Sequence, residues 1–266
     1  MTWNWTLLDA GRFRLDGGSM FGVVPKALWS RLVEPDEENR IPEACNCVLL
    51  EKNGERVLIE TGYGDGWNDK EVDMFAMNGT TIIDVLNEYS INPDSINTII
   101  LSHLHFDHAA GVTLLPNAKV IVQRQEWEDA NNNRSTMSKT YLPHVLNSIK
   151  DRVELIDGNN TVCDDIQLTI RKGHTWGLQS IEFKDSDGTV CFCSDVMPTT
   201  NHVGVAYSMG YDMLPWDNAQ TKQALLEQAH NENWRLILYH EPETPVVTVA
   251  KNDKGRFVLE ITNDCS

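Results

Sequence analysis

Three of the eight histidines lie within residues 103–108, a segment that reads His-Leu-His-Phe-Asp-His. Imidazole nitrogens and carboxylate oxygens are common ligands of zinc and other first-row metals. Because a single residue separates His103 from His105, both side chains can face one ion if the segment is extended. Asp107 and His108 then point elsewhere and can serve a second ion. The spacing predicts a pair of neighbouring metal ions, the arrangement that two-metal hydrolases use to activate water.

Three further ionisable residues each follow a short apolar run that predicts a strand. Side chains at strand ends can converge on one edge of a sheet, where active sites are often built. We therefore expect these residues to complete the set of metal ligands. They are His174, Asp195 and His240, which follow residues 166–171, 190–193 and 236–239.

The elements that position these residues alternate between strand and helix, which predicts an α/β fold. An apolar strand at residues 97–101 leads directly into the histidine cluster. Asn53 and Gly54 predict a tight turn between the strands 45–51 and 56–60. Further strands are expected at 119–122, 152–156, 166–171, 180–183, 190–193, 236–239, 246–249 and 257–261, and helices at 80–89, 125–130, 142–149 and 217–232.

The first part of the chain predicts a short strand at residues 1–5 and a glycine-rich loop at residues 17–22. Asp217 is the residue type that commonly caps a helix, so we expect it to begin the helix 217–232. No repeat, low-complexity tract or linker divides the sequence. We therefore expect residues 1–266 to form a single domain.

The charge balance limits the classes of molecule that the protein can bind. The chain has 22 Lys and Arg against 39 Asp and Glu, a net charge of −17, which disfavours nucleic acids and anionic membranes. No apolar run approaches the ~18 residues of a membrane span, and the first residues do not resemble a signal peptide. We therefore expect a cytoplasmic protein that acts on a small molecule. Buried thiols, not disulfides, are expected at the alternating pairs Cys45, Cys47 and Cys191, Cys193.

Together these motifs resemble the metallo-β-lactamase superfamily of dinuclear metal hydrolases. The resemblance also includes the turn Glu60-Thr61-Gly62, where the family usually has Asp-Thr-Gly. It implies an αββα sandwich, with two mixed β-sheets flanked by helices and the metals at one sheet edge. By motif position, one ion is held by His103, His105 and His174, the second by Asp107, His108 and His240, and Asp195 bridges the two.

The resemblance also implies a mechanism and a cofactor. The cofactor is a pair of divalent ions, zinc in the first place, although His and carboxylate sites also accept Mn, Fe or Co. A hydroxide shared by the ions attacks the substrate, Asp107 transfers the proton, and Asp195 maintains the bridge, so we assign both aspartates a catalytic role. A homodimer formed through residues 17–40 is a further implication.

Within the superfamily, three segments look like the branch of acyl-homoserine lactone lactonases and organophosphate hydrolases. They are residues 18–29, 174–177 (His-Thr-Trp-Gly) and 209–212 (Met-Gly-Tyr-Asp). Lactonases of this branch commonly have a tyrosine three residues after the bridging aspartate, whereas this chain has Pro198. Tyr207 or Tyr211 is expected to replace it, and the substrate is expected to be a small neutral ester or lactone. The residues expected around the substrate are Met20, Phe21, Trp29, Phe106, Tyr207 and Tyr211.

Three alternatives remain open from the sequence. A thiolester hydrolase or a mononuclear-iron sulfur dioxygenase of the same superfamily shares much of this ligand set. The thiolester hydrolase normally has a basic glutathione site, for which this acidic chain offers little support. The third alternative is a metal-binding protein without catalysis, which keeps the ligands but has no accessible pocket.

Overall fold

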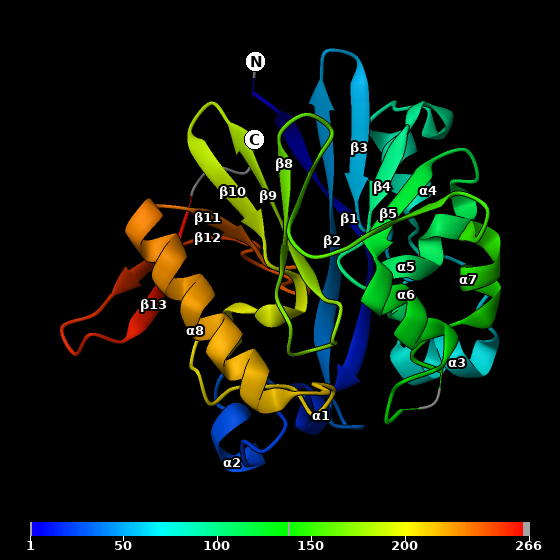
Figure 1. Ribbon diagram of the computed structural model, residues 1–266. Helices are drawn as coiled ribbons and strands as arrows, with labels where there is room; N and C mark the ends of the chain where they lie inside the picture. The colour runs from blue at the N-terminus through cyan, green and yellow to red at the C-terminus, as the bar shows by residue number, and fades with distance from the viewer. Residues whose placement is uncertain (1, 138, 263–266) are drawn as a thin grey trace.

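Two mixed β-sheets pack against each other at the centre of the molecule (Figure 1). The computed structural model describes residues 2–137 and 139–262. Helices cover the outer sides of both sheets, which gives an αββα sandwich. The fold class expected from the sequence is therefore confirmed.

The first sheet has six strands that follow one another in chain order. Its first three strands are antiparallel neighbours, and the predicted turn at Asn53 and Gly54 joins the second to the third. From the third strand onward the neighbours run parallel. The strands are β1 (Asn4–Asp16), β2 (Arg40–Lys52), β3 (Glu55–Ile59), β4 (Thr98–Ile100), β5 (Lys119–Gln123) and β6 (Val153–Ile156).

The second sheet has seven strands in the order β13-β12-β11-β10-β9-β8-β7. β10 and β11 are parallel, and the other neighbouring pairs are antiparallel. The strands are β7 (Asn160–Val162), β8 (Ile166–Ile170), β9 (Gln179–Asp185), β10 (Gly188–Phe192), β11 (Arg235–Ile237), β12 (Val246–Lys251) and β13 (Phe257–Ile261).

Figure 1 shows α4 to α7 beside the first sheet and α8 across the second. In the described part of the chain, none of the helices has the length and apolar character needed to cross a membrane. The helices are α1 (Gly17–Phe21), α2 (Lys26–Trp29), α3 (Asp69–Phe75), α4 (Ile82–Glu88), α5 (Phe106–Ala109), α6 (Arg124–Asn131), α7 (Pro143–Ile149) and α8 (Pro215–Glu232), with short 3-10 turns at Pro93–Ser95, Ala110–Leu114, Ser194–Val196 and Thr200–His202.

The alternation of side chains along β10 explains how the second sheet buries both faces. Val190 and Phe192 belong to the core between the two sheets. Cys191 and Cys193 point the other way and pack in a separate apolar cluster with α8 residues such as Leu225. Both thiols are free and fully buried, as expected, which gives them a packing role.

Three local expectations were wrong. The first strand does not end at residue 5 but continues to Asp16. The expected glycine-rich loop is the short helix α1, because an Asp16 carboxylate oxygen accepts a hydrogen bond from the Ser19 amide at 2.8 Å and caps the helix. α8 begins at Pro215, so Asp217 lies inside its first turn instead of capping it. Proline suits this first position because it lacks the amide hydrogen that would remain unpaired there.

Gly111 fixes the histidine segment against the turn after β3. A Cβ atom at this position would lie 2.0 Å from the carbonyl oxygen of Thr61. The same turn contributes the Thr61 amide and hydroxyl, which both donate hydrogen bonds to the carbonyl oxygen of His108 at 2.9 Å. The close backbone approach therefore holds His108 in place.

We predict that Gly111→Ala lowers the free energy of unfolding by about 3 kcal/mol, because the added methyl group must displace a buried backbone. Chemical denaturation of the metal-free protein measures this loss. Gly255→Ala is the control, since a Cβ atom there meets nothing within 4 Å and only the positive φ of 70° opposes the change. Equal losses in the two variants would contradict the role given to Gly111.

Candidate metal centre

The histidine segment changes direction where it leaves the first sheet. After β4 the chain bends at Ser102 and continues without regular structure to His105, which is the residue before α5. The helix then carries Asp107 and His108, and the ring of His108 lies 4.0 Å from that of His103. One short segment thus supplies four candidate ligands. They fall into the two pairs that the spacing predicts, and His103 and His108 also form a third group with Asp195.

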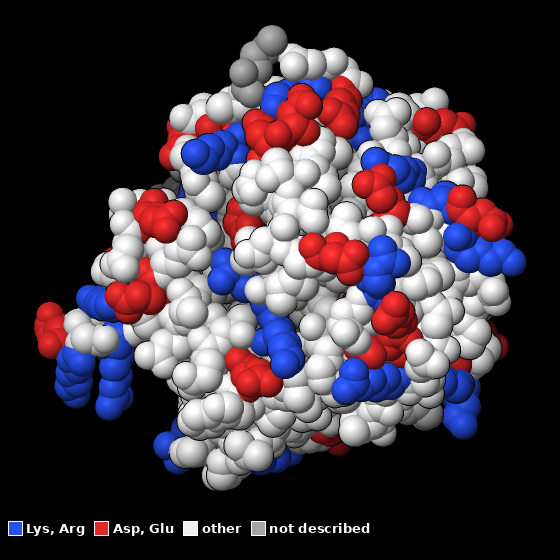
Figure 2. All heavy atoms as spheres, viewed as in Figure 1, with Lys and Arg blue, Asp and Glu red and all other residues white. Residues whose placement is uncertain are grey.

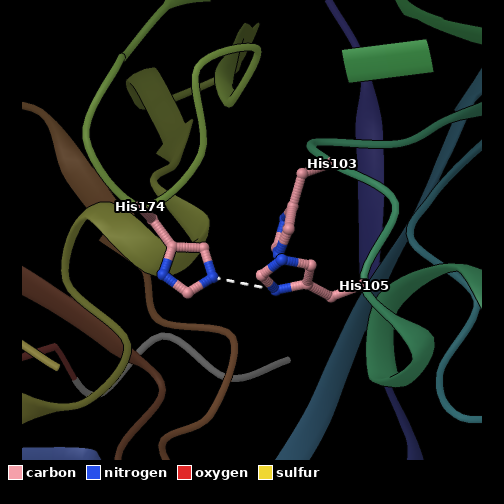
Figure 3. Close-up of side chains that lie close together, drawn as sticks. All are labelled: His103, His105 and His174. Carbon is pink, nitrogen blue, oxygen red and sulfur yellow. Dashed lines mark hydrogen bonds between the residues drawn. The ribbon is translucent and has the colours of Figure 1, made fainter. Parts of the chain in front are cut away.

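The first ligand group consists of three histidines from two parts of the chain. His103 and His105 follow β4, and His174 lies between β8 and β9. Nε2 of His174 lies 3.0 Å from Nδ1 of His105, and one nitrogen of each ring lies within 4.8 Å of the others. Figure 3 shows the three imidazole rings turned toward one another. All three residues are buried, which shields an ion placed between them from bulk water.

The second ligand group consists of Asp107, His108 and His240, whose ligand atoms also lie within 4.8 Å of one another. Nε2 of His240 lies 3.5 Å from Oδ2 of Asp107. His240 comes from the chain that follows β11, so this group also joins the two sheets. The two groups match the two ligand sets that the resemblance implies.

Asp195 lies between the two groups. Its Oδ2 atom is 3.1 Å from Nε2 of His174 in the first group. Its Oδ1 atom is 3.4 Å from Nε2 of His108 and 3.6 Å from Nε2 of His240 in the second. Each carboxylate oxygen therefore faces a different group, which is the arrangement that a bridging ligand needs.

Several buried ligand atoms have no partner within the described chain. Nε2 of His103, Nε2 of His108 and Oδ1 of Asp195 are all buried without a hydrogen bond. Such atoms are rare in folded proteins, because burial removes water without replacing its hydrogen bonds. Divalent cations would satisfy all three, and imidazole with carboxylate is a donor set that Zn, Mn, Fe and Co accept. The residues therefore fit the metal ions.

The pKa shifts differ among the ligands. Burial by itself would lower the pKa of His108 and His174, but Asp195 raises both above the usual range, so a metal ion has to displace a proton from these two rings. Burial lowers the pKa of His103 and His105 well below its usual range, which keeps both rings neutral and able to ligate. Burial by itself would raise the pKa of Asp195, but His108 and His174 lower it well below its usual range. Asp195 is therefore ionised and supplies negative charge between the two groups.

Hydrogen bonds behind the ligands direct the remaining ring nitrogens. Nδ1 of His240 donates to the carbonyl oxygen of Ala44 at 3.0 Å, and Nδ1 of His174 donates to Asp212 at 2.9 Å. Such contacts fix the tautomer and leave Nε2 free for a metal. Sequence reasoning gave Asp212 no role, because nothing in its neighbourhood shows which ring it will meet.

Glu60 lies behind His108, but the two side chains do not form a hydrogen bond like those behind His174 and His240. Its Oε2 atom lies 3.5 Å from Nδ1 of His108, and its Oε1 atom accepts a hydrogen bond from the Ser102 amide at 2.7 Å. The family usually has aspartate at this position, and the longer side chain still reaches the ring. The departure at Glu60 therefore keeps a carboxylate beside His108 without a hydrogen bond to its ring.

A cavity of about 400 Å³ opens beside the ligands. Met20, Phe106 and Tyr211 line it, as the sequence analysis expects. Sequence reasoning missed the contribution of α3 and the residues before it, because no side chain of this helix is fully buried and no apolar periodicity marks it. The other lining residues are Leu15, Trp67, Glu71, Met74, Phe75, His105, Asp107, Met137, Lys139, Thr140, His174, Asp195, Met209 and His240.

Three expected substrate contacts do not line this cavity. The ring of Phe21 stacks on Trp29 at 5.4 Å and on His202 at 4.9 Å, and the ring of Tyr207 meets its edge at 6.1 Å. Phe21 and Trp29 are completely buried by this stacking. Phe21, Trp29 and Tyr207 therefore pack with one another outside the cavity lining, which differs from the expected direct contact with substrate.

Comparison with known proteins identifies the family. Residues 40–240 match the family model of the metallo-beta-lactamase superfamily. The chain belongs to this superfamily. An N-acyl homoserine lactonase of Bacillus thuringiensis is 32% identical over 168 residues, which cover 58% of this chain and 64% of the lactonase. The match thus spans less than two thirds of the length of that relative.

Solved structures extend the likeness of this member of the superfamily over nearly its whole length. A probable metal-dependent hydrolase from Staphylococcus aureus has a TM-score of 0.88 and 26% identity, with 98% of each chain covered. A dizinc quorum-quenching lactonase in complex with its product has a TM-score of 0.81 and 18% identity, over 98% of this chain and 95% of that one. At that identity the second likeness concerns the fold alone.

Removal of the carboxylate between the groups tests the assembly of the centre. We predict that Asp195→Ala binds fewer than two ions per chain, because both groups lose a shared negative ligand. Metal analysis after dialysis measures the content, and Asp253→Ala, an exposed change in a turn, serves as the control. Full metal content in the Asp195 variant would refute its bridging role.

We expect the buried His202 to make the folded state less stable as the pH falls. Burial lowers its pKa from 6.5 to about 3 in the folded chain. The unfolded chain therefore binds one more proton between these pH values, so this residue destabilises the fold as the pH falls below about 6.5. We predict that His202→Gln weakens the acid dependence of the free energy of unfolding by up to about 1.4 kcal/mol per pH unit.

Denaturation of the metal-free protein between neutral and mildly acidic pH measures this slope. The glutamine amide can still donate to the carbonyl oxygen of Met20, the partner of His202 Nε2 at 2.8 Å. His144→Gln is the control, because His144 is exposed. An unchanged slope in the His202 variant would show that its proton uptake does not contribute.

Proposed function

We propose that this chain is a metal-dependent hydrolase that holds two divalent ions, zinc in the first place, and opens small lactones such as N-acyl homoserine lactones. The observation that carries the proposal is the position of Asp195 between two groups of three ligands. Five of these seven ligands also line the cavity, so a substrate in the cavity meets the centre directly. The lactonase named among the relatives supports the choice of substrate.

Two divalent ions in such a centre generate a nucleophile from water at neutral pH and polarise the substrate carbonyl. The ligands of this chain hold the centre in a fixed geometry at one end of the cavity. Asp107 both belongs to the second group and lines the cavity. We assign to its carboxylate the transfer of a proton to the leaving oxygen of the opened ring.

The cavity wall favours a neutral substrate with an apolar part. Apart from the metal groups, its charged lining residues within the described chain are Glu71 and Lys139, and these pair with each other at 2.8 Å. Aromatic and methionine side chains make up much of the remaining wall, and they suit an acyl chain. Figure 2 shows Lys and Arg interspersed with Asp and Glu on the visible face, without a broad basic area.

Tyr211 is the residue that we assign to the position of the missing lactonase tyrosine. Pro198 has no side-chain donor, and Tyr207 lies outside the lining of the cavity. Tyr211 lines the cavity together with the metal ligands. Burial raises its pKa to about 12, so the hydroxyl stays protonated and can donate to a substrate carbonyl.

A substrate panel tests the proposed activity. The metal-loaded protein is assayed with acyl-homoserine lactones of increasing chain length, aryl esters, phosphotriesters, β-lactams and lactoylglutathione. We expect lactones to give the highest kcat/KM. Preference for lactoylglutathione would favour the thiolester alternative, and no turnover with two bound ions would favour the metal-binding alternative.

We predict that Tyr211→Phe lowers kcat for the lactone about 100-fold, as expected when one donor to a developing oxyanion is lost. Tyr207→Phe is a matched control, because it removes the same atom from a neighbouring ring outside the cavity lining. Steady-state kinetics separates kcat from KM. If both variants lose the same activity, Tyr211 is not the donor.

A further inference from the structure

Glu126 is a completely buried carboxylate that lies behind the first ligand group. It belongs to α6, which follows β5 in the first sheet. It is not among the seven ligands, and it does not line the cavity. Its position is therefore unexplained by the metal centre alone.

One oxygen of Glu126 holds the segment that carries two of the ligands. Its Oε1 atom accepts a hydrogen bond from the Leu104 amide at 3.0 Å, and Leu104 stands between His103 and His105. The same oxygen accepts a hydrogen bond from the Tyr141 hydroxyl at 3.2 Å. The ring of Tyr141 lies 5.3 Å from that of His105, so this contact supports His105 from a second side.

The other oxygen of Glu126 holds the segment that carries the third ligand. Its Oε2 atom accepts a hydrogen bond from the hydroxyl of Thr175 at 2.6 Å, and Thr175 directly follows His174. The same segment packs closely on α6, since a Cβ atom at Gly177 would lie 2.4 Å from the Glu126 amide nitrogen. One carboxylate thus connects two segments that come from different sheets.

From these contacts we infer that Glu126 is a positioning residue that sets the spacing between His174 and the pair His103 and His105. The inference rests on the two-metal centre of the proposed function. A metal bound by three histidines needs all three nitrogens at fixed distances, and the contacts behind the ligands set those distances. If the link through Glu126 is lost, the two segments can separate. The second group has no hydrogen bond to Glu126 in the described chain.

Glu126→Gln tests this inference with little change in size. The glutamine oxygen can still accept from the Leu104 amide, but the amide nitrogen then faces Thr175 and can only donate to its hydroxyl. The charged acceptor that connects the two segments is therefore lost. We expect the affinity for one of the two ions to fall about 10–100-fold, as is typical when a group behind a metal ligand is changed. Metal analysis after dialysis against a weak chelator should then give about one ion per chain, against two for the unaltered protein.

Two further variants separate positioning from general stability. Thr175→Val removes the contact to one segment only and should weaken the same ion. Glu182→Gln is the matched control. Within the described chain this buried carboxylate contacts Thr169, Ser180, Arg171 and Cys191, and none of these is a candidate metal ligand. The Glu182→Gln variant should retain two ions even if its thermal midpoint falls.

The outcomes distinguish this inference from the proposed function. Two ions retained in Glu126→Gln would overturn it, as would the loss of both ions together with a drop in thermal midpoint. An unaltered protein that binds fewer than two ions would instead contradict the dinuclear centre. Because the readout is metal content, the result does not depend on which substrate the protein hydrolyses.

Discussion

The shared carboxylate of Asp195 is the interaction on which the centre depends. Seven candidate ligand side chains are buried at the end of the cavity, and four of their polar atoms have no hydrogen-bond partner within the described chain. Burial of so many polar groups is unfavourable unless other charges compensate for it. Asp195 faces both histidine-containing groups, so a single residue couples them electrostatically. The fold and the metal ions are therefore expected to stabilise each other.

Much of the centre was predictable because its ligands have unusual local surroundings. The segment 103–108 is dense in histidine, and His174, Asp195 and His240 each follow an apolar run. The sandwich fold followed from the resemblance, and the structure confirms it. The single domain, the homodimer and the cytoplasmic location stay predictions.

The features of the site that the sequence did not predict depend on contacts between residues far apart in the chain. Phe21 and Trp29 stack in the interior, whereas Phe75 lines the cavity, although all three are aromatic residues near helix ends. Aromatic type alone does not distinguish a core position from a wall position. Likewise, Asp212 supports His174 across 38 residues of sequence, and no local pattern marks that pairing.

The position of α3 in the cavity wall affects how the substrate preference of this protein can change. The helix contributes Glu71, Met74 and Phe75 to the cavity, yet none of its residues is fully buried and its N-terminus is secured by its own capping box with Asn68. Changes at partly exposed positions generally cost little stability. New substrate preferences can therefore arise on this helix through single substitutions while the catalytic machinery is inherited unchanged.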